Sequence, residues 1–551
     1  MRFRGSVEAT AVVLGAVLLA CVFTYPVVFH FTNAGRLDTN DGRWSIWVVS
    51  WVAHALTTDP LNLFRANIFY PHPNALAFSE GNIVAGLIGA PIWALTHNPY
   101  TTHNFVYLFS FAQSFIATYY LVRYLTGDRR AAIVAGVMYA FCPFAFVRQA
   151  HIQLAMVGFL PWCMLAWHRF LDQTSIPRAI ELGLVLALTG LACAYYGIFA
   201  GGMIAFASIW FAFSHRRHKD LSYWRAVAVA AMVCIGVIGP FFLPYMRMQE
   251  ATGFERSLTG QYSANLGAWL LSSAWAHRWW APFLDKPSEG LFPGILAIAL
   301  GVWGAAVMLR SDKSDIAKYY IGLGVFTLWL TLGPSAGLYT ALYYTVPVFS
   351  FLRAPSRAGI VVTLCLVVLA APAMVSLMRP IRLAVPAQGK RRRLNITFAA
   401  LLTLAVADTY RAPLRTREAP PLAEAYRTLA ELPKAPTIEL PYWATSPEYH
   451  RHAEYMLAST QHWQPLINGY SDHIPQDFRD AAPVLATFPS PQSFAILQPL
   501  GARYALFRLD LMNASTREQL VRRLDHDYAG ILRPLEKSGD VWLYEIIAWP
   551  R

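Results

Sequence analysis

Two carboxylates, Asp38 and Asp41, lie in one short loop directly after the first long apolar stretch of the chain. A carboxylate held at a membrane surface can take the proton from a hydroxyl group, as a general base does. We expect Asp41 to have this role, because Gly42 beside it leaves room for a substrate to approach, and we keep Asp38 as the alternative. Taken alone, Asp41 fits a simple helix-capping aspartate equally well.

The residues that follow this loop predict an amphipathic helix over positions 44–56. Trp44, Trp47 and Trp51 recur at helical spacing with Val48, Val52 and Ala55, whereas Ser45, Ser50 and His54 fall outside that stripe. Tryptophan favours the headgroup region of a membrane, so we expect the helix to lie flat in the interface. It would then hold Asp41 at a fixed depth near the water boundary.

Cations at the outer ends of other apolar spans are candidates for binding a phosphate group. They are Arg148, His151, Arg353 and Arg357, and arginine suits phosphate through its planar, two-pronged guanidinium. Arg353 and Arg357 could equally reach out to lipid headgroups. His72, held between two prolines, could contact a phosphate or an acceptor, or could simply be a rigid loop residue.

Glu80 is a third acidic residue of this region, and it precedes a short apolar segment. It could be a second functional carboxylate, or it could favour the start of a helix through the helix dipole. Asp38, Asp41 and Glu80 could also bind a divalent metal. The six cysteines lie within apolar spans and predict no disulfide framework or metal cluster.

Composition decides the class of protein. Of the 551 residues, 56% are hydrophobic and only 14% are charged, which is more apolar surface than a water-soluble fold can bury. The formal net charge of +13 does not indicate a nucleic-acid partner, because residues 411–551 are balanced, with 15 basic and 16 acidic residues. The excess lies in the short loops of the apolar part, as expected for a polytopic membrane protein.

Eleven apolar stretches predict transmembrane helices. The segment Ile83–Leu95 is short, contains Pro91, and is predicted to be re-entrant or interfacial, because counting it as a crossing would invert all the basic loops that follow. This places the N-terminus in the cytoplasm and the C-terminal tail outside. The predicted spans are 9–31, 100–122, 131–147, 154–167, 179–193, 197–213, 226–245, 291–309, 316–332, 358–378 and 394–410.

The chain divides into a transmembrane domain, residues 1–410, and an extracytoplasmic domain, residues 411–551. The first contains two long outer loops, 32–80 and 246–290. A proline-rich linker opens the second, and short strand patterns at 438–440, 504–507 and 541–546 with helical patterns between them predict a small α/β domain. Within it, Trp463 and Tyr470 lie in an aromatic and polar run that suits an acceptor sugar, although a buried strand and turn is the alternative.

Several outer-face segments together resemble the GT-C membrane glycosyltransferases, in particular the bacterial branch related to protein mannosyltransferases and aminoarabinose transferases. The segments are Asp41 with its tryptophan-rich helix, 67–73 (NIFYPHP), 78–80 (FSE), 124–127 (YLTG) and 351–357 (FLRAPSR). The resemblance covers the transmembrane domain. It implies a polyprenyl-phosphate sugar donor, a first-loop carboxylate as base, and frequently an outer C-terminal domain. We also expect inversion at the sugar.

We therefore expect a multi-pass protein of the bacterial inner membrane that transfers a sugar from a polyprenyl-phosphate donor to a glycan, lipid or protein acceptor at the outer face. The alternatives are a transporter or flippase of a lipid-linked substrate and a non-enzymatic envelope assembly protein. A transporter would carry ionisable groups near the bilayer midplane, whereas the charged residues here gather at the ends of the spans.

Overall fold

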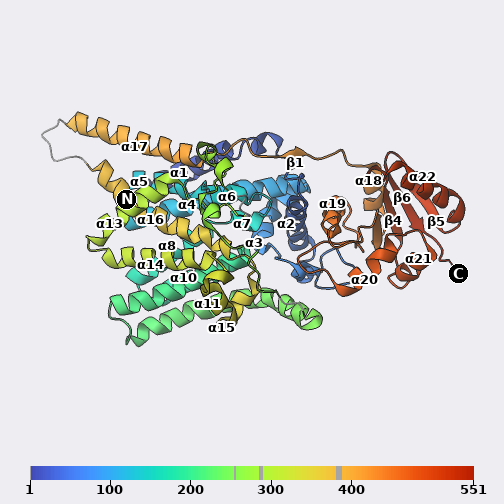
Figure 1. The fold of residues 1–551 in the computed structure, drawn as a ribbon, viewed down its shortest axis with the longest axis horizontal. Coiled ribbons are helices and arrows are strands. Elements are labelled where there is room, and N and C mark those ends of the chain that lie inside the picture. The colour runs from blue at the N-terminus through green and yellow to red at the C-terminus, as the bar shows by residue number, and fades with distance from the viewer. Residues whose placement is uncertain (1, 254–255, 285–288, 380–386, 551) are drawn as a thin grey trace. The chain divides into compact units, whose positions relative to one another are not determined.

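The structure is a computed structural model that describes residues 2–253, 256–284, 289–379 and 387–550. Parts of the predicted outer loop 246–290, namely 254–255 and 285–288, lie outside the described residues. The chain forms two compact units (Figure 1). The first contains Met1–Phe29, Val106–Phe242 and Glu255–Leu414, and the second contains His30–Phe105, Leu243–Phe254 and Arg415–Arg551.

The helices identify a multi-pass membrane protein. Among the described residues, six helical segments are long and apolar enough to cross a bilayer: Ser6–Phe23, Pro99–Thr126, Arg129–Val147, Ala194–Ser214, Leu221–Thr252 and Pro355–Met378. Helices form at all eleven predicted spans. At five of these spans, however, the helices are too short or too polar to cross a bilayer by the criteria of length and composition. The count of eleven crossings therefore stays a prediction.

The first unit is built almost entirely of helices. Their bounds are α1 Arg2–Phe23, α4 Pro99–Thr126 (shared with the second unit), α5 Arg129–Ala140, α6 Pro143–Val147, α7 Ile152–Ala155, α8 Phe159–Asp172, α9 Ile176–Ala192, α10 Ala194–Ser214, α11 Leu221–Thr252 (also shared), α12 Leu266–Leu270, α13 Ile295–Leu309, α14 Ser314–Thr331, α15 Leu338–Thr345, α16 Gly359–Met378 and α17 Ala387–Thr409.

Prolines explain where the helices depart from the predicted spans. The first predicted span runs to residue 31, but α1 ends at Phe23 because Pro26 cannot continue a helix. The span 131–147 is split into α5 and α6 before Pro143 for the same reason. Prediction from hydrophobicity alone therefore made these helices too long, because it did not take account of the prolines that end them.

Small residues and tyrosine hydroxyls pack the helices of this unit. A Cβ atom on Gly304 of α13 would lie 1.9 Å from the Leu369 carbonyl oxygen of α16, so only glycine permits this close approach. The buried Tyr319 hydroxyl donates to the Met203 carbonyl oxygen, 3.0 Å away. Such bonds join helices where water cannot satisfy the polar groups.

The second unit combines two helices from the first part of the chain with the C-terminal tail. The helices near the start of the chain are α2 Asn40–Thr58 and α3 Ile83–Thr96. The tail contains α18 Glu424–Glu431, α19 Ala453–Ala458, α20 Gln476–Leu485, α21 Pro491–Leu497 and α22 Ala514–Arg522, with strands β3 Thr437–Leu440, β4 Tyr504–Arg508, β5 Leu532–Glu536 and β6 Val541–Ile546.

The tail strands form one four-stranded sheet in the order β3-β4-β6-β5. Only the pair β3 and β4 is parallel. Helix α18 covers one face of the sheet through Tyr426, which packs with Tyr504 and Leu506 of β4 (Figure 1). On the other face, Phe507 of β4 stacks with Phe488. The strands predicted at 438–440, 504–507 and 541–546 are confirmed.

A buried carboxylate lies inside this tail. Glu439 of β3 is fully buried and accepts a hydrogen bond from the Tyr426 hydroxyl. Burial raises the pKa of Glu439 to about 7, while the charge of Arg508 and the bond from Tyr426 oppose this rise. The side chain of Glu439 is therefore a titrating group in the tail core.

Backbone pairing ties the start of the second unit to its tail. A two-stranded sheet joins β1, Ala34–Gly35, to β2, Arg417–Glu418. Further on, the Phe69 amide donates to the Asn468 carbonyl oxygen, and the Leu466 amide donates to that of Asn67. The first loop is therefore part of the same folded body as the tail.

Candidate functional site

Helix α2 carries the first candidate base. Its N-cap is Thr39, whose hydroxyl accepts the Gly42 amide at 3.1 Å, so neither aspartate is the cap. Asp41 lies in the first turn of α2 and is exposed. An exposed carboxylate at a helix N-terminus has its negative charge favoured by the helix dipole.

Asp38 has a different environment from Asp41. The Arg36 guanidinium donates to both carboxylate oxygens of Asp38, at 2.8 and 3.3 Å. Burial alone would raise the pKa of Asp38, but the hydrogen bond and charge of Arg36 outweigh it and lower that pKa below its usual value. Because its proton affinity is lowered and both its oxygens are engaged, Asp38 is the weaker candidate for a base.

Gly42 has a reason for being glycine that differs from the one predicted. A Cβ atom at this position would lie 2.0 Å from the Arg36 carbonyl oxygen. The space beside Gly42 is therefore filled by the protein's own backbone and is not a path for substrate. Glycine is needed here to bring the Arg36–Asp38 turn against the start of α2.

The tryptophan face of α2 contacts protein, which corrects the prediction that it faces lipid headgroups. Trp47 and Trp51 are buried. Their indole N–H groups donate to the Asn67 side-chain oxygen at 3.3 Å and to the Leu63 carbonyl oxygen at 2.9 Å. The helix forms where predicted, but packing inside the second unit holds it in place.

The tail supports α2 from one side. Leu37 and Ile46 form an apolar cluster with Leu457 of α19. Arg43 lies 3.9 Å from the carboxylate of Glu454, which is also 2.8 Å from Arg508 of β4. Apolar contact and a chain of charges thus connect the helix of Asp41 to the central sheet of the tail.

Asn67 is the polar link between the first loop, α2 and the tail. Its side-chain amide donates to the Ser459 hydroxyl at 3.0 Å and to the Gln464 carbonyl oxygen at 3.2 Å. Its oxygen accepts the Trp47 N–H group. Asn67 is buried, so all three bonds form away from solvent.

Two other first-loop candidates also bind to or lie near the tail. The His72 ring nitrogen lies 3.0 and 3.1 Å from the two carboxylate oxygens of Asp477 in α20. Ser79, next to Glu80, donates to Asp472 at 3.2 Å. Glu80 is half-buried just before α3. His72 therefore joins the first loop to the tail, whatever else it contacts.

The tail aromatics differ in their surroundings. The half-buried Trp463 stacks on the His54 ring at 4.5 Å and meets Trp51 and Trp93 edge-on. Burial, with the nearby charge of Lys434, lowers the pKa of His54 to about 4, so this stacking partner is neutral at pH 7. Tyr470 is half-buried, with its ring 6.4 Å from that of His450.

The first unit brings the predicted arginines together. The Tyr195 hydroxyl accepts the Arg353 amide at 3.0 Å, and the Tyr195 ring lies 4.4 Å below the guanidinium of Arg357. Among the described residues, the Arg357 Nε and the Ser356 hydroxyl are buried without a hydrogen-bond partner. Buried donors of this kind are costly unless a ligand binds them.

Arg148 belongs to the same group. It is buried, feels the positive charge of Arg357, and forms an ion pair with the buried Glu289. His151 follows one turn later, at the start of α7. Burying like charges near each other is unfavourable, so Glu289 offsets part of the positive charge that gathers around Tyr195.

The carboxylates and the arginines belong to different units: Asp38, Asp41 and Glu80 are in the second, and Arg148, Arg353 and Arg357 are in the first. Over the described ranges of the chain, no three histidine, cysteine or acidic side chains gather closely enough to hold a metal ion. The carboxylates of the second unit therefore do not form a three-ligand group by themselves.

Comparison with known proteins places the fold. No family model matches the chain, and no curated protein matches it. The cryo-EM structure of the arabinofuranosyltransferase AftD from Mycobacteria aligns with 98% of this chain and 40% of that one, at 16% identity and a TM-score of 0.52. A mutant form of AftD aligns with 97% of this chain and 41% of that one, at 16% identity and a TM-score of 0.58. The chain therefore shares the fold of AftD, a GT-C membrane glycosyltransferase.

The GT-C fold confirms the predicted fold family. The chain spans about two fifths of the length of the AftD structures that it matches. The crystal structure of ArnT from Cupriavidus metallidurans in the apo state covers the whole of both chains at 12% identity, with a TM-score of 0.48.

Sequence reasoning missed Tyr195 and Asn67. Tyr195 lies in an apolar helix, where an aromatic residue normally signals packing, and nothing local shows that two distant arginines use it. Asn67 lies in a segment noted for resemblance alone. Its partners Trp47, Ser459 and Gln464 come together only in the folded chain.

Proposed function

We propose that this GT-C chain is a glycosyltransferase that moves a sugar from a polyprenyl-phosphate donor to an acceptor hydroxyl at the outer face of the membrane. The observation that carries the proposal is the contrast between the two first-loop aspartates. Asp41 is exposed in the first turn of α2, whereas Asp38 is partly buried and its pKa is lowered by the hydrogen bond and charge of Arg36. Asp41 is therefore the more accessible carboxylate, and the lowered proton affinity of Asp38 makes Asp38 the weaker base.

In the proposed reaction, Asp41 takes the proton of the acceptor hydroxyl as its oxygen attacks the anomeric carbon of the donor sugar. The bond between that carbon and the phosphate oxygen breaks, and the electron pair leaves with the phosphate. Attack opposite to the leaving group inverts the anomeric centre. Asp41 ends protonated and returns its proton to water.

The departing phosphate needs positive charge and hydrogen-bond donors. Arg353 and Arg357 supply them, with Arg148 and His151 beside them. The unpartnered Arg357 Nε supports this role, because a phosphate oxygen would satisfy a donor that is otherwise buried without a partner among the described residues. His72 and Glu80 have first-loop positions from which they could contact the acceptor.

The tail has a supporting role in this proposal. It holds α2 through Asn67 and Glu454, and it presents Tyr470 and the half-buried Trp463 as acceptor contacts. Because Trp463 also packs against α2, Trp463→Ala would alter both acceptor binding and the placement of Asp41. Tyr470→Ala is the cleaner test of acceptor binding, which should appear as a raised KM for the acceptor with kcat retained.

The decisive experiment compares Asp41→Asn with Asp38→Asn in full-length protein, with sugar transfer from a polyprenyl-phosphate donor as the assay. Asp41→Asn should bind donor but lose on the order of a hundredfold in turnover, as expected when a general base is removed. Asp38→Asn should lose much less. Near-normal turnover of Asp41→Asn would refute the assignment, and a large loss in Asp38→Asn alone would transfer the role to Asp38.

A further inference from the structure

A lipid-sized groove lies in the first unit, among α1, α4 and α5. Its volume is about 730 Å³, within the range of small-molecule sites. Most of its lining is apolar, and the polar residues Glu8, Tyr119 and Arg129 line it as well. The apolar residues are Val7, Ala11, Val12, Gly15, Leu19, Phe115 and Ile133.

The polar side chains come from the ends of their helices. Glu8 lies near the start of α1, Arg123 near the end of α4, and Arg129 at the first position of α5. The ends of three apolar helices coincide here, and membrane helices end where the lipid headgroups begin. A ligand with an apolar chain and a polar head would therefore be oriented correctly in this groove.

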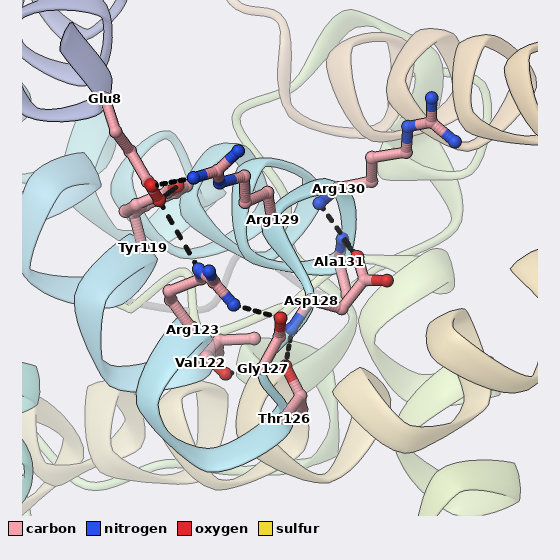
Figure 2. Close-up of polar contacts among 10 residues, drawn as sticks. All are labelled: Glu8, Tyr119, Val122, Arg123, Thr126, Gly127, Asp128, Arg129, Arg130 and Ala131. Carbon is pink, nitrogen blue, oxygen red and sulfur yellow. Dashed lines mark hydrogen bonds and ion pairs between the residues drawn. The ribbon is translucent and has the colours of Figure 1, made fainter. Parts of the chain in front are cut away.

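Figure 2 shows how these side chains are arranged. The Glu8 carboxylate accepts the Tyr119 hydroxyl at 2.6 Å and the Arg123 Nε at 3.4 Å, and it also binds Arg129. Arg129 remains 58% exposed, so it can bind a second anion without leaving Glu8. Glu8 holds two arginines together at the groove and offsets part of their charge.

A second basic group begins at the next residue, Arg130, whose side chain points away from Arg129 and Glu8 (Figure 2). Arg130 donates to Asn395 of α17 at 2.9 Å, and its guanidinium lies 5.8 Å from the centre of the Phe398 ring. Arg391 and Arg392 are four and three residues before Asn395, so they project from the same side of α17, and both are exposed. This end of the groove has a strong excess of positive charge.

We propose that this groove binds an anionic phospholipid of the membrane, with one acyl chain between α1, α4 and α5 and its phosphate at Arg129. The charge at the groove end selects an anionic headgroup over a neutral one, because a basic pocket between membrane helices attracts anionic lipid. Glu8 weakens the site by competing with the phosphate for Arg129. This inference does not depend on the proposed transferase activity.

The test uses full-length protein in detergent, with dioleoylphosphatidylglycerol and dioleoylphosphatidylcholine as probes and native mass spectrometry to count retained lipid. The wild type should retain the anionic lipid in preference to the neutral one. The double variant Arg129→Gln/Arg130→Gln should lower that retention on the order of tenfold. Glu8→Gln should raise it, a result that a misfolded variant would not give.

A pair of glycine variants tests whether the groove itself is occupied. Gly15 lines the groove, and a Cβ atom there meets nothing within 4 Å, so Gly15→Leu fills the groove without a clash. Gly202→Leu in α10 has the same open surroundings away from the groove and is the control. Gly15→Leu should abolish preferential retention, and Gly202→Leu should preserve it.

Three results would overturn the proposal: equal retention of the two lipids by the wild type, unchanged retention in Gly15→Leu, or weaker anionic-lipid retention in Glu8→Gln. The first result would show that the site does not select lipids by charge. The second would show that the lipid does not bind in the groove. The third would show that Glu8 supports the site and does not compete with the phosphate.

Discussion

Replacing Asn67 with alanine should detach the helix of Asp41 from the tail. The substitution removes three buried hydrogen bonds and leaves the Trp47 N–H group and the Gln464 carbonyl oxygen without this partner. Ser459 still donates to the Met456 carbonyl oxygen, so the loss of its bond with Asn67 adds little to the free-energy cost. Each buried group left unpaired costs roughly 1–3 kcal/mol, and we expect a total of about 3 kcal/mol.

Hydrogen exchange with mass spectrometry on the full-length protein in detergent measures this loss. About 3 kcal/mol corresponds to roughly a hundredfold faster exchange of amides that exchange through this opening. Phe69, Tyr70 and Leu466 donate backbone bonds between the loop and the tail, so their amides should respond most. Turnover should fall in the same variant, because Asp41 loses its fixed position.

The matched control is Asn62→Ala in the same loop. Asn62 is exposed, and its side-chain amide nitrogen donates to the nearby Asp59 carboxylate, so its loss should change stability by less than about 0.5 kcal/mol. Unchanged protection of α2 in Asn67→Ala would refute the reasoning, since the attachment would then rest on the apolar contacts alone.

Three further substitutions give separate tests. The pKa of Glu439 is raised to about 7, against about 4.5 in the unfolded chain. Its contribution to the free energy of unfolding, about 3 kcal/mol, is therefore fully present below pH 4.5 and is lost as the pH rises through 7. Glu439→Gln should flatten this pH dependence of β3 protection, and an unchanged slope would contradict the assignment. Gly42→Ala should push the Arg36 carbonyl away and lower turnover at least tenfold with donor binding retained; normal turnover would show that the turn can shift freely. His72→Ala removes a half-exposed contact with Asp477 and should cost at most about 1 kcal/mol in loop protection, whereas a large loss of donor binding would instead place His72 at the phosphate.

The strands of the tail show what could be predicted locally and what could not. Strands β3, β4 and β6 are short apolar runs, and each was predicted at its place. Strand β5 was missed because it contains Pro534 and alternates with charged residues. These features suit its edge position and its irregular pairing with β6, but they weaken the strand signal.

The candidate site shows the same division. The stripe of Trp47 and Trp51 predicted an amphipathic helix correctly, but an apolar stripe has the same pattern whether lipid or protein covers it. Its true partners include Asn67 and Trp463, and the second of these lies far along the chain. Local sequence therefore predicted the helix and its carboxylates but not what holds them in position.

The joining of the first loop to the tail has a consequence for how the protein is made. Asn67 bonds Ser459, a residue 392 positions later, so the loop is synthesised and delivered to the membrane surface long before its partner exists. Until then the Asn67 amide nitrogen lacks the Ser459 hydroxyl and the Gln464 carbonyl oxygen that it binds in the folded protein, and the loop cannot complete its packing. The loop that follows the Asp41 helix therefore completes its packing only after residues 459–464 have been synthesised, and we expect a chain truncated before residue 459 to leave this loop exposed to chaperones and proteases.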